Sequence, residues 1–125
     1  MKPRDAALRL KRFEVAERAR KVASIETMIQ DLEHMAEDLT RQISSEEERT
    51  GIKDLAHFAY STFAKAAAQR RANLTTSIAD LRLKLDAARR EHEEVAAELG
   101  KIEPAVETRD NDRMMRKSDR NAMIG

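Results

Sequence analysis

A repeating pattern of apolar residues runs through both halves of the chain. Every seventh residue from position 8 to position 43 is apolar, and a second apolar position follows three residues later in the middle of this segment. Another series begins at residue 64, with steps that mostly alternate between three and four residues. This spacing is the heptad of helices that pack along an apolar seam. The two series are Leu8, Val15, Val22, Ile25, Ile29, Leu32, Ala36, Leu39 and Ile43, and then Ala64, Ala67, Leu74, Ile78, Leu81, Leu85, Ala88, Val95, Leu99 and Ile102.

Few residues interrupt these series. The 125 residues include three glycines and two prolines, and 38% of the side chains are charged, which is typical of long helices. The pattern breaks between the two series, where Gly51 suits a left-handed helix end and Asp54 or Ser61 suits the start of the next helix. Pro104 should end the second helix, because proline lacks the N–H that the helix ladder needs.

These features together predict an all-α fold of two long helices, with one hairpin domain and a tail. The hairpin occupies residues 1–103, with helices at about 4–49 and 61–103 and a tip at about 50–60. The polar, aperiodic segment 104–125 should be a flexible, frayed C-terminal tail.

Charge alternates along the chain. Residues 1–21 carry eight basic and three acidic side chains, whereas residues 22–48 carry one basic and eight acidic. Residues 49–90 are again mostly basic and residues 91–107 again mostly acidic. Folding back at Gly51 places basic stretches against acidic ones only if the helices are antiparallel. The sequence therefore predicts an antiparallel coiled-coil hairpin.

Two registers fit such a hairpin. A tight tip places Ile29 opposite Leu74, whereas a longer loop that runs through Tyr60 places Ile29 opposite Leu81. We favour the longer loop.

The sequence offers little for catalysis or for binding a cofactor or metal. The histidines lie far apart in the sequence, and no phosphate-binding loop, nucleophile motif or zinc-ligand spacing occurs. We expect no enzymatic activity and no cofactor. The net charge of +1 argues against a nucleic-acid partner, and the absence of a long apolar run argues against membrane insertion. Without a cysteine or a signal-peptide pattern, we expect a cytoplasmic protein.

Several apolar residues lie off the seam and are candidates for binding other proteins. Leu10 and Phe13 fall on the side opposite Leu8, so a regular helix exposes them near the open end of the hairpin. A local irregularity that turns Phe13 inward is the alternative. Met28 and Met35, seven residues apart, lie beside the seam; they either widen the apolar stripe or form an adaptable docking face.

The tip holds three of the four aromatic residues of the chain: Phe58, Tyr60 and Phe63. A helix through this segment would place Tyr60 on the seam and the two phenylalanines on other faces, so a two-helix core cannot bury all three rings. They either close the end of the hairpin or project as a contact for a partner. The first interpretation is favoured, and the same rings could serve both purposes.

Two stretches resemble a known family. "LRLKRFEVAERARKVASIETMIQDLEHM" resembles the N-terminal helix of FliJ-type flagellar type III export proteins, and "HFAYSTFAKAAAQRRANL" is similar to the start of the second helix in alphaproteobacterial members. The resemblance covers roughly residues 4–103. It implies a cytoplasmic, non-catalytic hairpin similar to the central stalk of rotary ATPases.

The resemblance also implies partners. The open end would enter the ring of the hexameric flagellar export ATPase, the tip half would contact the membrane export gate, and the protein would handle export chaperones. Two other functions fit a helical hairpin: a prefoldin-like holdase and a coiled-coil scaffold. Prefoldins add β-hairpins, and no alternating strand pattern occurs here, which disfavours the holdase.

Overall fold

The protein is built from two long helices. The computed structural model describes residues 2–124, with side chains described for 2–103 and 112–116. Its helices are α1 (Pro3–Thr50) and α2 (Thr62–Ile124), and the described residues form no strand. The two helices pack against each other, which confirms the predicted all-α hairpin. No described helix contains a segment long and apolar enough to cross a bilayer.

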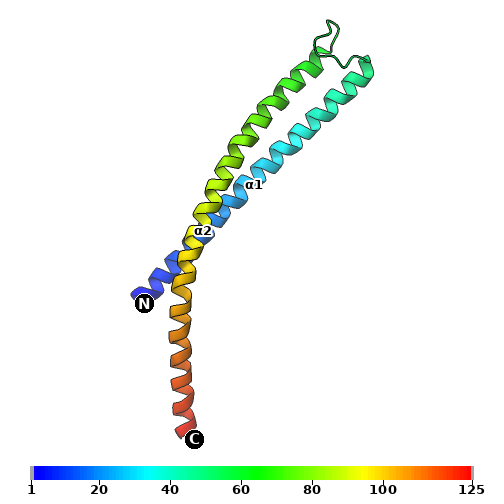
Figure 1. The fold of residues 1–125 in the computed structure, drawn as a ribbon. Coiled ribbons are helices and arrows are strands. Elements are labelled where there is room, and N and C mark those ends of the chain that lie inside the picture. The colour runs from blue at the N-terminus through cyan, green and yellow to red at the C-terminus, as the bar shows by residue number, and fades with distance from the viewer. Residues whose placement is uncertain (1, 125) are drawn as a thin grey trace. The chain divides into compact units, whose positions relative to one another are not determined.

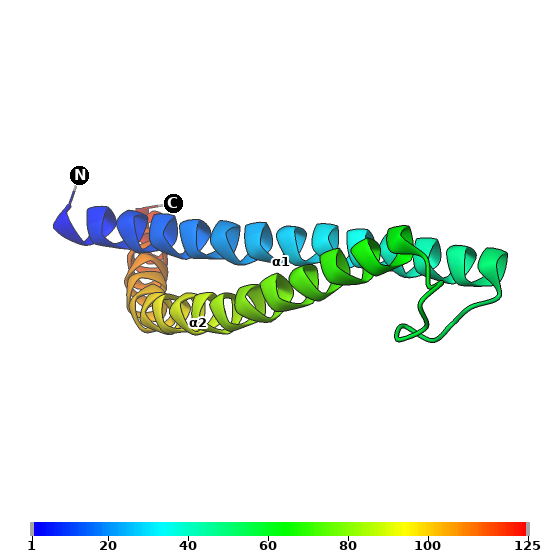
Figure 2. The same ribbon diagram turned by 90° about the horizontal axis from the view of Figure 1, so that it is seen from above.

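The chain divides into two compact units, and both helices contribute to each. The terminal unit consists of Met1–Arg20 and Ala88–Gly125, and the tip unit consists of Lys21–Ala87. Within the tip unit, α1 and α2 run side by side in opposite directions and are joined by the loop 51–61 (Figures 1 and 2).

The apolar seam forms the core of the tip unit. Its buried residues all belong to the heptad series or to the loop, and no described residue of the chain buries a charged side chain. Ala64 is fully buried, and such a small side chain lets two helix backbones approach closely. The buried residues of the tip unit are Ile25, Ile29, Ile43, Tyr60, Ala64, Ala67, Ile78 and Leu85.

In the terminal unit, opposite charges connect the two helices. Leu8 and Ala88 are buried there. The basic start of α1 faces acidic residues of α2 and forms ion pairs with them, which confirms the antiparallel pairing predicted from charge. Exposed pairs of this kind contribute little stability individually, but they select the orientation of the helices. They include Lys11–Glu98 at 2.6 Å, Arg12–Glu103 at 3.1 Å and Arg18–Glu91 at 3.1 Å.

The register of the tip unit follows the longer of the two predicted loops. Arg82 pairs with Glu33 at 3.0 Å, and the Arg71 guanidinium donates a hydrogen bond to Thr40 Oγ1 at 3.2 Å. These contacts fit the alignment that places Leu81 opposite Ile29, seven residues away from the tight-tip alignment. This register therefore requires a connection as long as the loop 51–61, as predicted for the longer of the two loops.

Helix α2 extends further than the sequence predicts. The expected end was residue 103, but α2 continues through Pro104 to Ile124. Proline removes one backbone hydrogen bond, which a helix can accept where the residues on both sides favour helix. The segment after Pro104 has no glycine before the last residue, and its Ala, Glu, Arg and Met residues favour helix. Most side chains of 104–125 lie outside those described, and the flexibility of this tail stays a prediction.

Candidate functional site

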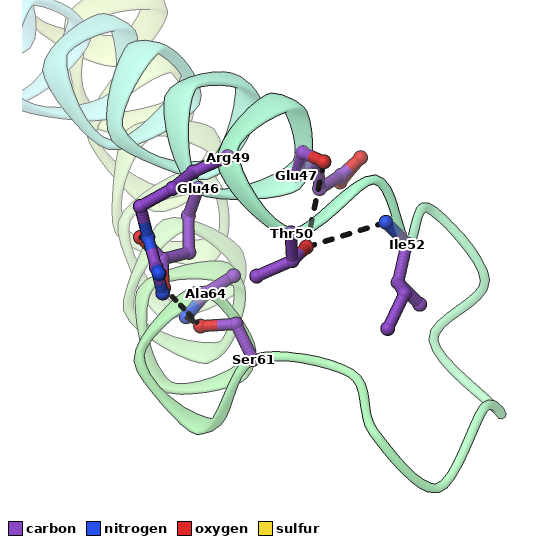
Figure 3. A network of polar contacts seen from close by, with 7 residues as sticks. All are labelled: Glu46, Glu47, Arg49, Thr50, Ile52, Ser61 and Ala64. Carbon is purple, nitrogen blue, oxygen red and sulfur yellow. Dashed lines mark hydrogen bonds and ion pairs between the residues drawn. The ribbon is translucent and has the colours of Figure 1, made fainter.

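The loop at the tip is ordered by local hydrogen bonds. Gly51 ends α1 with φ of 74°, the left-handed conformation predicted for it, and its N–H donates to the Glu47 carbonyl at 2.8 Å. The Ile52 N–H then donates to Thr50 Oγ1 at 3.3 Å (Figure 3). Further along, Asp54 Oδ1 accepts from the Ala56 N–H at 2.9 Å. The loop is therefore a series of tight turns.

Ser61 is the residue that begins α2. Its Oγ accepts a hydrogen bond from the Ala64 N–H at 3.1 Å, which is the geometry of an N-cap. The same hydroxyl donates to Glu46 Oε1 on α1 at 2.9 Å, so the cap also ties the two helices together (Figure 3). Hydrogen bonds from Arg49 first, and then from Ser61, lower the pKa of Glu46. Of the two N-cap candidates in the sequence, Ser61 caps α2 and Asp54 stabilises a turn.

Tyr60 closes the end of the apolar seam. Its ring is 9% exposed and packs with the buried residues Ile43, Ala64 and Ala67. Its hydroxyl donates a hydrogen bond to Glu47 Oε1 at 3.1 Å. Burial, followed by this hydrogen bond, raises the pKa of the Tyr60 hydroxyl. For this ring, the interpretation as a closure of the hairpin end is correct.

The other two rings of the tip face solvent. Phe58 is 96% exposed and stacks on His57, with the ring centroids 4.7 Å apart. His57 is in turn fixed in a turn, because its Nδ1 accepts from the Ala59 N–H at 3.0 Å. Phe63 is more than half exposed on the first turn of α2. The three aromatic residues therefore divide into one that packs inside and two that are available for contact.

Leu10 and Phe13 form an exposed apolar pair in the terminal unit. They are 59% and 58% exposed, whereas Leu8 beside them is 7% exposed. The heptad continues regularly through this part of α1, so the irregularity that would have turned Phe13 inward does not occur. The sequence placed these residues off the seam, and the structure leaves them uncovered by the described part of the chain.

Met28 and Met35 are also exposed, at 48% and 53%, so they do not widen the buried stripe. Met35 lines a hollow between α1 and α2 whose apolar floor is Leu39 and Leu74. The predicted residues thus fall into three separate places: the start of α1, the flank of the tip unit and the loop.

Comparison with family models, with curated proteins and with solved structures finds no match to this chain. The assignment of a function therefore depends on the exposed residues and on the resemblance of the two stretches quoted above.

Some exposed apolar residues were not singled out from the sequence. Leu55 in the loop is 58% exposed, and Leu83 on the tip-unit part of α2 is 70% exposed. Leu83 lies off the heptad series, so the rule that identified Leu10 would also have found it. The part of the chain with described side chains contains no group of three histidine, aspartate or glutamate residues placed to hold a metal ion.

Proposed function

We propose that this chain is a non-catalytic component of flagellar type III export that binds and regulates the hexameric export ATPase as a stalk-like hairpin. The observation that carries the proposal is the exposed pair Leu10 and Phe13 on α1. The family resemblance begins at this stretch and implies contact with the ATPase ring here. Apolar side chains left in water on an otherwise charged helix are suited to burial against a partner.

The loop supports the second part of the proposal, contact with the cytoplasmic side of the membrane export gate. Phe58 and Leu55 project from a loop whose turns are fixed by hydrogen bonds, so little conformational entropy is lost when a partner covers them. Export chaperones would be further partners. On this proposal the protein is cytoplasmic and peripheral at the inner-membrane export apparatus.

A double substitution, Leu10→Ala with Phe13→Ala, tests contact with the ATPase. Both side chains are mostly exposed, so the melting temperature of the free protein should stay nearly constant. A Leu or Phe buried at an interface contributes about 1.5–3 kcal/mol, and the losses at two neighbouring positions are not fully additive, so affinity for the ATPase should fall by roughly one to two orders of magnitude. The stimulation of ATP hydrolysis by the export ATPase and the swimming of the cells should decrease together with this affinity. Leu83→Ala is the control, because Leu83 is also an exposed leucine, at 70% against 59% for Leu10, and lies in the other unit.

Two outcomes would favour other functions. If the double variant binds the ATPase as well as the unchanged protein does, the contact is wrong and a coiled-coil scaffold becomes the better interpretation. If the unchanged protein instead suppresses aggregation of many unfolded proteins, and Phe58→Ser abolishes this, the prefoldin-like holdase is favoured. Copurification of partners from motile cells distinguishes these cases directly.

A further inference from the structure

His57 organises the tip loop, although its side chain is exposed. Its backbone N–H donates to the Asp54 carbonyl at 3.1 Å, and its own carbonyl accepts from the Tyr60 N–H at 3.0 Å. Its side chain adds two contacts: Nδ1 accepts from the Ala59 N–H at 3.0 Å, and the ring stacks on Phe58 with an interplanar angle of 22°. The orientation of the Phe58 ring therefore depends on His57.

These contacts fix which nitrogen of neutral His57 carries the proton. The Ala59 N–H can only donate, so Nδ1 must be the unprotonated acceptor. The ring proton is then at Nε2. This Nε2–H forms no hydrogen bond with any described residue, so the tip presents a hydrogen-bond donor next to the Phe58 ring.

We propose that the tip docks into an apolar pocket of a protein, and that a carbonyl or carboxylate at the rim of this pocket accepts the His57 Nε2–H. The pocket takes the Phe58 ring, which is 96% exposed. Because the two ring centroids are 4.7 Å apart, a surface that encloses Phe58 also reaches His57. A donor that lost water there without gaining an acceptor would weaken binding, so the pocket must supply one. This inference rests on the proposed contact with the export gate and states what the receiving site must contain.

Charge at the tip favours a protein over a lipid bilayer as the partner. Residues 46–49, at the end of α1, carry three glutamates and one arginine, and in the loop Lys53 balances Asp54. The tip is therefore net acidic, and anionic lipid headgroups repel it. A ring that is held in one orientation before contact is suited to a pocket of matching shape, because little conformational entropy is lost on docking.

Two NMR measurements on the free, full-length protein test the arrangement at His57. The 15N chemical shifts of the neutral ring should place the proton at Nε2. The Ala59 amide should exchange with solvent roughly fivefold faster in His57→Ala than in the unchanged protein, because its acceptor is lost. His57→Asn should restore the slow exchange, since the asparagine Oδ1 is bonded to Cγ as Nδ1 is and accepts from the amide two residues on. A proton at Nδ1, or unchanged Ala59 exchange in His57→Ala, would overturn the proposal.

Calorimetric titration with the cytoplasmic part of the export gate tests the docking itself. Phe58→Ala and His57→Ala should each reduce the affinity by roughly tenfold, the first through the loss of the ring and the second through the loss of its orientation and of the donor. His57→Asn keeps the turn but lacks the Nε2–H, so its affinity should fall by roughly threefold. His34→Ala removes an exposed histidine of α1 and should bind as the unchanged protein does. Circular dichroism should show the same melting temperature for all four variants within about 2 °C.

The outcomes separate this inference from the proposed function. If Phe58→Ala loses affinity for the gate but His57→Ala does not, the gate contact stands and the inference about His57 is wrong. If Phe58→Ala binds the gate as the unchanged protein does, both are wrong. Binding of the unchanged protein to vesicles of phosphatidylcholine and phosphatidylglycerol, abolished by Phe58→Ala, would place the ring in lipid and overturn the protein pocket.

Discussion

The tip provides a matched pair of aromatic deletions, Tyr60→Ala and Phe58→Ala. The two residues lie two positions apart in the same loop, but Tyr60 is 9% exposed and Phe58 is 96% exposed. Deleting an aromatic ring from a fully enclosed core costs about 3–5 kcal/mol. Tyr60 lies at the end of a two-helix seam, against Ile43, Ala64 and Ala67, so roughly half of that loss is expected. For a chain of this length, the melting temperature should fall by roughly 6–10 °C.

Phe58→Ala should change the melting temperature by less than about 2 °C, because an exposed ring has no packing to lose. Thermal denaturation followed by circular dichroism at 222 nm measures both variants, since 89% of the chain is helical. Tyr60→Phe keeps the ring and removes only the hydrogen bond to Glu47, so its effect should lie between those of the two alanine variants. If Phe58→Ala destabilises the protein as much as Tyr60→Ala does, the division of the tip into a packed ring and a free ring is wrong.

Three further outcomes are expected. Gly51→Ala should destabilise the protein by about 1 kcal/mol in urea denaturation, entirely through its φ of 74°, because the added Cβ meets no atom within 4 Å. Tyr60 is the only tyrosine and there is no tryptophan, so absorbance at 295 nm should report its pKa directly, above the ordinary 10.0. Since this pKa is raised by folding, stability is fully present below pH 10 and should decrease as the pH rises through the raised value. The pKa of Glu98 should lie below the ordinary 4.5 because Lys11 donates a hydrogen bond to it, so its contribution to stability is lost as the pH falls through that lowered value. Lys11→Met should return the pKa of Glu98 toward 4.5 in an NMR titration.

The sequence predicts the helices and their pairing well, because both depend on regular periods. Ile25, Ile29 and Ile43 are buried where the heptad places them, and Leu10 and Phe13 are exposed where it excludes them. The alternation of charge predicts the antiparallel orientation for a similar reason: it extends over many residues, so no single contact decides it.

The features that sequence reasoning missed depend on local geometry. The direction of each ring in the loop follows from turns at Asp54 and His57, and a periodic rule cannot resolve these turns. Met35 on α1 and Leu74 on α2 line one hollow of the tip unit, and they are brought together only once the register is known. The sequence places the end of α2 too early, because Pro104 removes one hydrogen bond but the residues after it still favour helix.

The contacts between the loop and α1 also limit how the two helices of the tip unit can move. A heptad seam looks nearly the same after a shift of seven residues, so the seam alone resists sliding only weakly. Sliding one helix along the other would break both the Tyr60 hydrogen bond to Glu47 and the Ser61 hydrogen bond to Glu46. Such sliding would also have to open the hydrogen-bonded turns of the loop 51–61. These two hydrogen bonds and the closed loop therefore resist sliding of α1 along α2 in the tip unit, whereas they leave the pair free to bend or twist together.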